Sequence, residues 1–164
     1  MKILDTNQIS QKIKRMAIEI YERHSEESQI FLAGVNNNGL QLANLLLKEI
    51  ESLSPLKASI CQIKLNPAKP TESDIIIDLP SAKLKSKVVI LVDDVANTGR
   101  TIFFACKPFM NIIVKKIEVA VLVDRKHKSF PVMVDYVGLS LATTLQENIE
   151  VKLNTQVGSA VFLN

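Results

Sequence analysis

The most informative stretch of the chain is V-V-I-L-V-D-D-V-A-N-T-G-R-T, from Val88 to Thr101. It opens on a continuous apolar run, Val88 to Val92, and such β-branched runs are typical of parallel strands that are buried on both faces. Two adjacent acids, Asp93 and Asp94, follow at once, and after them a loop rich in hydroxyl side chains. A helix is predicted from Thr101 onward, so this stretch is a strand, a loop and a helix in succession.

The rest of the chain repeats this alternation. Apolar residues at helical spacing predict a first helix capped by Asp5 or Thr6, a second from Leu40 to Ile50 after the turn cluster Asn36–Gly39, and a third from Thr101 to Ile113, which Pro108 should kink or shorten. Strands are predicted at Gln29–Val35, Ala58–Leu65, Ile75–Leu79, Val88–Val92, Ile117–Val123, Val134–Leu139, Val151–Leu153 and Ala160–Leu163. The pattern indicates an α/β class with a mainly parallel sheet, in one domain over residues 1–164.

Two of these strands enclose an unusual connection. The residues between Ala58–Leu65 and Ile75–Leu79 include Pro67 and Pro70 and few apolar side chains. We therefore expect a hairpin with a long, exposed and mobile connection, which could close over a substrate.

Composition excludes several classes of protein. Of the 164 residues 47% are hydrophobic and 23% charged, which excludes a disordered chain, and no apolar run approaches the roughly 20 residues of a membrane helix. The first residues lack the apolar core of a signal peptide, so we expect no export, no membrane partner and a cytoplasmic location.

Cys61 and Cys106 lack metal-site spacing and are predicted to be buried, reduced thiols. A net charge of +3 neither demands nor excludes nucleic acid.

The acids and the loop after Val92 predict a ligand site. Ligands of open α/β sheets bind beyond the carboxyl ends of strands, and a helix start offers free N–H groups to a phosphate. Gly99 lets the backbone approach an anion, and Thr98 and Thr101 add hydroxyl donors. Asp93 and Asp94 could accept hydrogen bonds from sugar hydroxyls, so the stretch predicts a ribose-5-phosphate site. The alternatives are a capped helix without a ligand and a phospho-receiver domain, in which the acid pair would lie near the chain start.

The stretch resembles the phosphoribosyl diphosphate (PRPP) signature of type I phosphoribosyltransferases, an apolar strand followed by an acid pair and T-G-x-T. The segments Val121–Pro131 and Asp135–Gly138 are similar to the bifunctional pyrimidine-operon attenuator and uracil phosphoribosyltransferase group. This resemblance implies a type I phosphoribosyltransferase fold, in which helices flank a mostly parallel sheet of about five strands under a small hood. It also implies PRPP and a nucleobase as substrates, with Mg²⁺ held through substrate oxygens and without direct protein ligands.

The resemblance also implies roles for individual residues. Asp93 and Asp94 would be the catalytic pair on the ribose hydroxyls. The 5-phosphate would bind Ala96, Asn97, Thr98, Gly99, Arg100 and Thr101. The pyrophosphate loop would be Asn36, Asn37, Asn38 and Gly39, and the base would meet Asp124 and Arg125.

Some positions depart from the family pattern. Asn36–Asn38 stand in place of a Lys-Thr-Arg sequence, Lys64 and Lys69 are the only cations near the expected mobile loop, and Ala142-Thr143-Thr144 replace a Pro-Thr-Ser motif. Asn97 stands where purine-salvage relatives carry an acid, and an amide cannot act as a general base, which disfavours a 6-oxopurine substrate.

We expect no catalytic role for either histidine. We expect His24 to lie at a helix end without a partner, and His127 to be structural or exposed.

Two functions follow from these features. The first is transfer of ribose 5-phosphate from PRPP to a nucleobase, with a pyrimidine such as uracil favoured. The second is a nucleotide-sensing regulator on the same scaffold that contacts RNA and catalyses little, with Lys83, Lys85, Lys87, Lys126 and Lys128 as candidate RNA contacts. In either case we expect a homo-oligomer.

Overall fold

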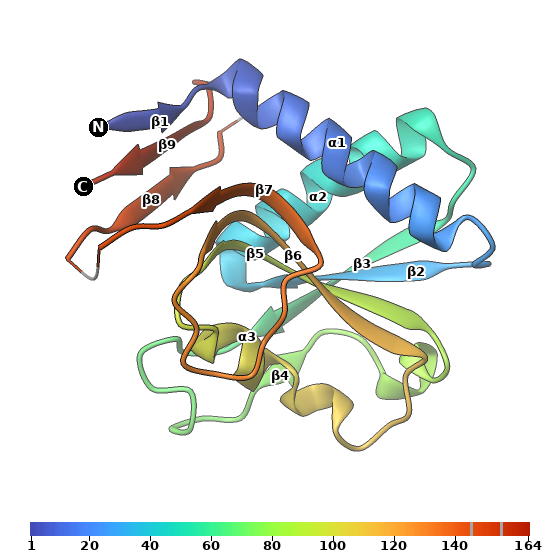
Figure 1. The fold of residues 1–164 in the computed structure, drawn as a ribbon. Coiled ribbons are helices and arrows are strands. Elements are labelled where there is room, and N and C mark those ends of the chain that lie inside the picture. The colour runs from blue at the N-terminus through green and yellow to red at the C-terminus, as the bar shows by residue number, and fades with distance from the viewer. Residues whose placement is uncertain (145, 155) are drawn as a thin grey trace.

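A six-stranded sheet forms the centre of the molecule (Figure 1). The computed structural model describes residues 1–144, 146–154 and 156–164. The strand order is β4 (Ile76–Ile77), β3 (Ala58–Lys64), β2 (Ile30–Val35), β5 (Val88–Ala96), β6 (Lys116–Arg125) and β7 (Tyr136–Leu141). Every neighbouring pair is parallel except β3 and β4, which pair antiparallel at Ile63 and Ile77. The mostly parallel sheet and the hairpin of β3 and β4 are therefore confirmed.

Helices cover both faces of this sheet. Helices α1 (Thr6–His24) and α2 (Asn36–Leu53) pack on one face, where alternate strand residues such as Leu32, Ile90 and Leu122 are buried. Helix α3 (Arg100–Ala105) and the 3₁₀ turns η1 (Ser81–Leu84) and η2 (Lys107–Phe109) cover the other face. Burial on both faces explains why the strands read as continuous apolar runs.

A small second sheet joins the two ends of the chain. Its antiparallel order is β1 (Lys2–Leu4), β9 (Ala160–Leu163) and β8 (Ile149–Lys152), and we call these three strands the hood. The Met1 amino group donates to the Leu163 carbonyl at 2.6 Å, and Figure 1 shows the N- and C-termini side by side. The hood was expected from the resemblance, whereas β1 has only three residues and shows no periodicity that could predict it.

Helix α1 begins as its sequence predicts. Asp5 is the N-cap: its side chain accepts the Gln8 N–H at 2.8 Å, and the Gln8 side chain accepts the Asp5 N–H at 2.9 Å. This reciprocal capping box fixes the start of the helix at Thr6.

The expected turn at Asn36–Gly39 is the first turn of α2 instead. Asn36 has a φ of 52°, which asparagine tolerates, and its Oδ1 accepts the Leu65 N–H at 3.0 Å. A Cβ at Gly39 would lie 2.3 Å from the Val92 carbonyl oxygen. These polar side chains and the glycine therefore serve contacts with neighbouring strands, which propensity alone does not reveal.

The helix expected over Thr101–Ile113 is shortened, as Pro108 predicted. Helix α3 ends at Ala105, and Pro108 lies inside the 3₁₀ turn η2 that follows. Proline cannot donate the hydrogen bond that an α-helix needs at that position, which accounts for the early end.

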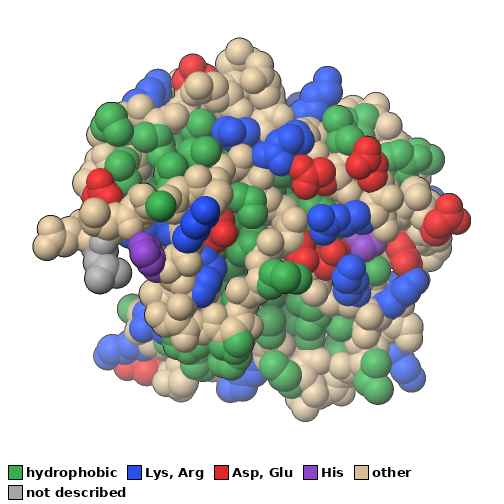
Figure 2. All heavy atoms as spheres, in the orientation of Figure 1, with side chains coloured by type: hydrophobic (Ala, Val, Ile, Leu, Met, Phe, Trp, Pro, Cys, Tyr) green, Lys and Arg blue, Asp and Glu red, His purple; other side chains and the backbone are tan. Residues whose placement is uncertain are grey.

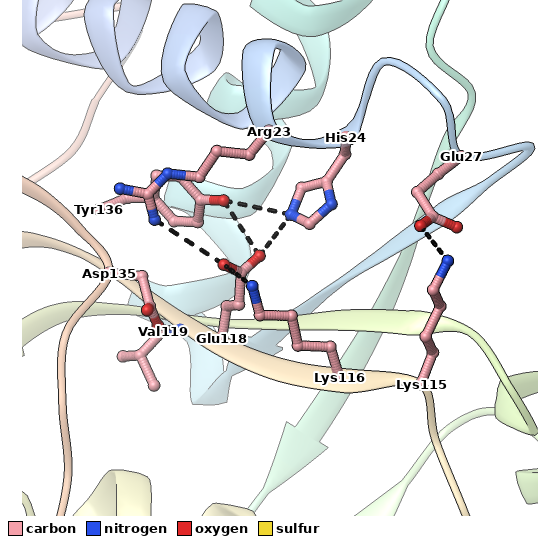
Figure 3. A network of polar contacts seen from close by, with 9 residues as sticks. All are labelled: Arg23, His24, Glu27, Lys115, Lys116, Glu118, Val119, Asp135 and Tyr136. Carbon is pink, nitrogen blue, oxygen red and sulfur yellow. Dashed lines mark hydrogen bonds and ion pairs between the residues drawn. The ribbon is translucent and has the colours of Figure 1, made fainter.

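The interpretation of His24 as a residue without a partner is wrong. His24 is buried, and its Nε2 pairs with Glu118 Oε1 from β6 (Figure 3). Tyr136 of β7 donates its hydroxyl to the same oxygen at 3.0 Å. Lys116 Nζ and Arg23 Nη1 lie 3.2 and 3.8 Å from Glu118 Oε2. This His24–Glu118 cluster joins the end of α1 to the sheet.

Electrostatics in this cluster favour a charged Glu118. Burial alone would raise the pKa of its carboxyl, but the hydrogen bond and charge of His24, with contributions from Lys116 and Tyr136, outweigh burial and lower the pKa to about 2. The pKa of Tyr136 is raised because its hydroxyl is buried and faces that carboxylate.

The cysteines are free in the structure. Cys61 is buried as predicted, whereas Cys106 is only half-buried. Burial, with a smaller effect of Asp78, raises the pKa of the Cys61 thiol to about 12, and burial also raises the pKa of Cys106. Within the described ranges, no helix has the length and apolarity that crossing a membrane requires.

Candidate functional site

The predicted site residues meet at the carboxyl ends of the central strands. In the parallel register Gly34 of β2 lies beside Val92 of β5, and Ala96 lies beside Asp124 of β6. The segments that follow these strands therefore emerge at one edge of the sheet. This is where open α/β sheets bind their ligands.

The acid pair and the asparagines share one hollow of about 400 Å³, which we call the acid hollow. Asn38 Nδ2 donates to Asp94 Oδ2 at 2.8 Å and so ties the start of α2 to the acid pair. The hollow is lined by Val35, Asn36, Asn37, Asn38, Pro67, Asp93, Asp94, Val95, Asn97, Thr101 and Ile149. The structure thus brings together two groups of predicted residues that lie more than fifty positions apart.

Asp93 and Asp94 have different environments. Asp93 is buried and accepts the Asp94 N–H at 2.9 Å, while Asp94 is half-buried and accepts the Val95 N–H at 2.9 Å. Burial and the adjacent Asp94 charge raise the pKa of Asp93 well above the ordinary aspartate value. Asp93 therefore keeps its proton to a higher pH than an isolated aspartate would. Carboxyl oxygens accept hydrogen bonds from hydroxyl groups, so the pair suits a sugar diol.

Residues Asn97–Thr101, which we call the anion loop, line a neighbouring hollow of about 460 Å³. Gly99 has a φ of 85°, in the left-handed region that glycine adopts at no cost. The Thr98 carbonyl accepts the N–H groups of Ser129 and Phe130 at 2.9 and 3.1 Å. These two bonds attach the loop to the segment that follows β6. Because α3 has only six residues, its dipole adds little, and the loop's own N–H and hydroxyl groups are the donors available to an anion.

The long connection Asn66–Asp74 borders both hollows. Arg100 Nη2 donates to the Pro67 carbonyl at 2.8 Å, and this bond holds the connection against the anion loop. Lys69 pairs with Glu72 at 2.8 Å within the connection. Nearly all of the connection is exposed, as predicted, while its mobility stays a prediction.

A third hollow of about 900 Å³ lies beyond the asparagines. It is lined mainly by amide and small side chains, with Lys64 and Asp74 as its charged residues: Asn36, Asn37, Gln62, Lys64, Leu65, Asn66, Pro67, Ser73, Asp74 and Ile76. Gln62, which sequence reasoning missed, is buried at the end of β3, and its Nε2 lies 3.4 Å from Asn37 Oδ1. A polar residue between the apolar residues Cys61 and Ile63 is the signal that could have found it.

The predicted base contacts Asp124 and Arg125 are engaged with the protein itself. Asp124 Oδ1 accepts from Lys128 Nζ at 2.5 Å. Arg125 donates from Nη1 to Asn97 Oδ1 at 3.1 Å, and from Nε to Thr143 Oγ1 at 2.6 Å. Both side chains lie at the edge that carries the acid hollow, but neither lines that hollow. Their contact with a base stays a prediction.

The donor set fits a metal that is carried by substrate. In the described part of the chain, no three His, Cys, Asp or Glu side chains gather into a possible metal site. Mg²⁺ prefers oxygen ligands and keeps several waters, so an ion that arrives on the oxygens of a diphosphate needs few ligands from the protein.

Comparison with known proteins gives the relationship. The chain matches the family of the phosphoribosyl transferase domain over residues 1–156. Two proteins named Bifunctional protein PyrR are similar to it. The one from Haemophilus ducreyi is 34% identical over 157 residues, which cover 92% of this chain and 88% of that protein. The one from Halalkalibacterium halodurans is 35% identical over 162 residues, with 93% and 89% covered.

Solved structures agree on the fold. A hypoxanthine-guanine phosphoribosyltransferase from Bacillus anthracis superposes with a TM-score of 0.68 at 21% identity, covering 86% of this chain and 84% of that one. A hypoxanthine phosphoribosyl transferase from Trypanosoma cruzi also gives 0.68, at 18% identity, with 85% and 77% covered. The family match over 156 residues, the PyrR relatives and the shared fold lead to one conclusion: the chain belongs to the phosphoribosyltransferase family, with its type I fold.

Proposed function

We propose that the protein transfers ribose 5-phosphate from PRPP to a pyrimidine base such as uracil. One observation carries the proposal: the acid hollow and the hollow of the anion loop adjoin, sharing Pro67, Val95, Asn97 and Thr101. A ribose 5-phosphate fits this arrangement, with its hydroxyls on Asp93 and Asp94 and its phosphate on the anion loop.

The reaction exchanges two bonds at the anomeric carbon of the ribose. A base nitrogen forms a bond to this carbon while the bond from the carbon to the pyrophosphate oxygen breaks. Pyrophosphate leaves with the electron pair of the broken bond. The base nitrogen loses its proton to solvent or to pyrophosphate. The ribose ring gains positive charge on the way, and the carboxylates of Asp93 and Asp94 stabilise it electrostatically. Mg²⁺, when bound with PRPP, neutralises charge on the leaving pyrophosphate. Asn97–Thr101 would hold the 5-phosphate and so orient the reacting carbon.

The preference for a pyrimidine rests on two features of the chain. The first is the resemblance of Val121–Pro131 to the pyrimidine-operon group. The second is Asn97, whose side chain lines both hollows and carries an amide that cannot remove a proton from a purine nitrogen.

A direct assay tests the proposal. The protein is incubated with PRPP, Mg²⁺ and each of uracil, cytosine, hypoxanthine and guanine, and pyrophosphate release is measured. We expect release with uracil and none with the purines. Asp94→Asn should reduce the rate by at least tenfold, whereas Glu150→Gln, an exposed acid of the hood that pairs with Lys152 at 3.3 Å, should not change it. Absence of release with every base would refute the transferase.

One observation supports a regulatory role as the second candidate. Among the described residues that line the acid hollow none is Lys or Arg, so the diphosphate of PRPP would meet carboxylates and amides there. A sensor that binds a nucleotide and contacts RNA needs no such cation. On the face that Figure 2 shows, however, Lys and Arg side chains lie interspersed with acidic ones, and Lys128 is already paired with Asp124. Binding of a nucleotide without pyrophosphate release would favour this second function.

We further propose that the protein is one domain over residues 1–164 and a homo-oligomer in the cytoplasm. The interleaved hood and sheet favour one domain, because the hood residues Leu4, Ile149 and Val161 share a core with the main sheet. The free thiols of Cys61 and Cys106 suit a reducing compartment. Sedimentation of the full chain measures the oligomeric state.

A further inference from the structure

We infer that Arg125 is a positioning residue, which links the anion loop to the segment that leads from β7 into the hood and so sets the geometry of the site without touching substrate. The inference rests on the proposed function, because it concerns how the anion loop is prepared for PRPP. It assigns to Arg125 a role different from the base contact that the resemblance implies.

The location of Arg125 makes this link possible. Arg125 is the last residue of β6, which lies between β5 and β7 in the sheet. The register places the preceding residue, Asp124, beside Ala96, the last residue of β5, and Arg125 itself beside Leu141, the last residue of β7. The side chain therefore lies between two segments: the anion loop that follows β5, and the residues after β7 that lead to the hood.

The guanidinium bonds to both segments at once. Nη1 donates to Asn97 Oδ1 at 3.1 Å on the side of the anion loop. Nε donates to the hydroxyl of Thr143 at 2.6 Å, and Nη2 to the Thr144 carbonyl at 2.7 Å, on the side of the hood. Thr143 is only 8% exposed, so its hydroxyl is a fixed acceptor. A planar guanidinium with donors in fixed directions can hold three such acceptors, which the ammonium of lysine cannot.

Neighbouring contacts fix Arg125 itself. Lys128 Nζ donates to the Arg125 carbonyl and pairs with Asp124, so the end of β6 is held on the backbone side. His127 Nε2 lies 3.0 Å from the Thr143 carbonyl oxygen and gives the hood side a second attachment. A side chain fixed in this way keeps its geometry before substrate arrives, which is what pre-organisation requires.

The two segments that Arg125 joins both reach the acid hollow. Asn97 lines this hollow directly. On the other side, the Thr144 N–H donates to Glu147 Oε2 at 2.7 Å. The chain then enters β8 at Ile149, which also lines the hollow. The link through Arg125 therefore sets the distance between the phosphate end of the site and the wall formed by the hood.

A double-mutant cycle tests this inference, with isothermal titration of PRPP and Mg²⁺ as the readout. Thr143→Val removes one acceptor of Arg125 and leaves the residues that line both hollows unchanged. We expect the Kd for PRPP to rise about fivefold to tenfold, the size of one typical intramolecular hydrogen bond. In the Arg125→Met background, where the link is already broken, the same substitution should change Kd by less than about 1.5-fold.

Kinetics and a matched control complete the experiment. Arg125→Lys keeps the positive charge and loses the planar set of donors that holds three acceptors. Because the anion loop would then be misplaced before binding, we expect the KM for PRPP to rise about tenfold and kcat to stay within about threefold of the wild-type value. Lys107→Gln removes one positive charge at an exposed residue that lines neither hollow, and it should leave both constants unchanged. Thermal melting checks folding of each variant, and should Arg125→Met fail to fold, Arg125→Lys serves as the background of the cycle.

The outcomes separate the two proposals. Binding of PRPP by the wild type with equal effects of Thr143→Val in both backgrounds would overturn the link and leave the proposed function standing. An unchanged Kd in the Thr143→Val variant alone would do the same. A wild type that binds no PRPP would instead overturn the proposed function, and this inference with it.

Discussion

Replacing Glu118 by glutamine should destabilise the protein at neutral pH and have little effect in acid. Glu118 is 1% exposed, and His24, Tyr136 and Lys116 surround its carboxylate (Figure 3). Glutamine keeps the shape of the side chain and removes the charge. The variant therefore measures what the charged form of Glu118 contributes to the folded state.

The magnitude follows from the pKa of this group. Its pKa falls from 4.5 to about 2 on folding. At about 1.4 kcal/mol per unit, the charged form stabilises the folded state by about 3 kcal/mol at pH 7. The same value is expected for breaking a buried ion pair, about 3–5 kcal/mol. In a protein of this size it would lower the Tm by roughly 6–12 °C.

The sign of the pH dependence is also fixed. Because the pKa of Glu118 is lower in the folded state, its contribution is complete well above pH 4.5 and disappears as the pH falls through about 2. The difference in unfolding free energy between wild type and Glu118→Gln should thus shrink to less than half its neutral value by about pH 3.

Urea unfolding at pH 7, 5, 4 and 3 measures this difference. Glu27→Gln is the matched control, since Glu27 pairs with Lys115 at the surface, where an ion pair contributes at most about 1 kcal/mol. A Glu118→Gln effect below 1 kcal/mol at pH 7 would contradict the argument. So would an effect that stays constant down to pH 3.

Three further predictions concern the site, the packing and the thiols. Asp94→Asn should weaken PRPP binding by about 1.5–3 kcal/mol in titration calorimetry, since a charged hydrogen bond to ribose is lost; unchanged affinity would make the acids part of a turn only. Gly39→Ala should destabilise the protein by about 1–3 kcal/mol in urea, because the new Cβ would lie 2.3 Å from the Val92 carbonyl oxygen; a stabilised variant, as helix propensity alone predicts, would contradict this packing. Iodoacetamide at pH 8 should modify half-buried Cys106 slowly and Cys61 only after unfolding, because burial raises the pKa of Cys61 to about 12; rapid labelling of native Cys61, read by mass spectrometry, would refute its burial.

The sequence predicted the parts of the fold that depend on local pattern. The run Val88–Val92 is typical of a buried parallel strand, which predicts that the acids after it lie at the carboxyl edge of the sheet, and the structure places them there. The structure brings Asn36–Asn38 to the same edge, because the strand before them is the neighbour of β5. The direction of the strands was thus within reach of sequence reasoning, whereas the placement of β2 beside β5 comes from the structure.

Pairings between distant segments were not. His24 and Glu118 are 94 residues apart, and no local pattern joins them. A signal did exist on the helix side, since His24 continues the buried series Ile13, Ala17 and Ile20 at helical spacing. Placing it on the apolar face would have predicted its burial, and a buried histidine needs a polar partner. The identity of that partner depends on the packing of α1 against β6, which only the structure gives.

The arginines show why the chemistry of the site could not be deduced from residue types alone. Arg100 and Arg125 stand where a sequence suggests positive charge for a phosphate or a base. In the structure both guanidiniums donate to protein oxygens, of Pro67 and of Asn97, Thr143 and Thr144. Their positive charge still acts on an anion at the anion loop, because Coulomb attraction does not require contact. Their hydrogen bonds, however, hold the long connection and the residues after β7 against the anion loop. We therefore propose that both arginines act on the site chiefly through the geometry of the anion loop.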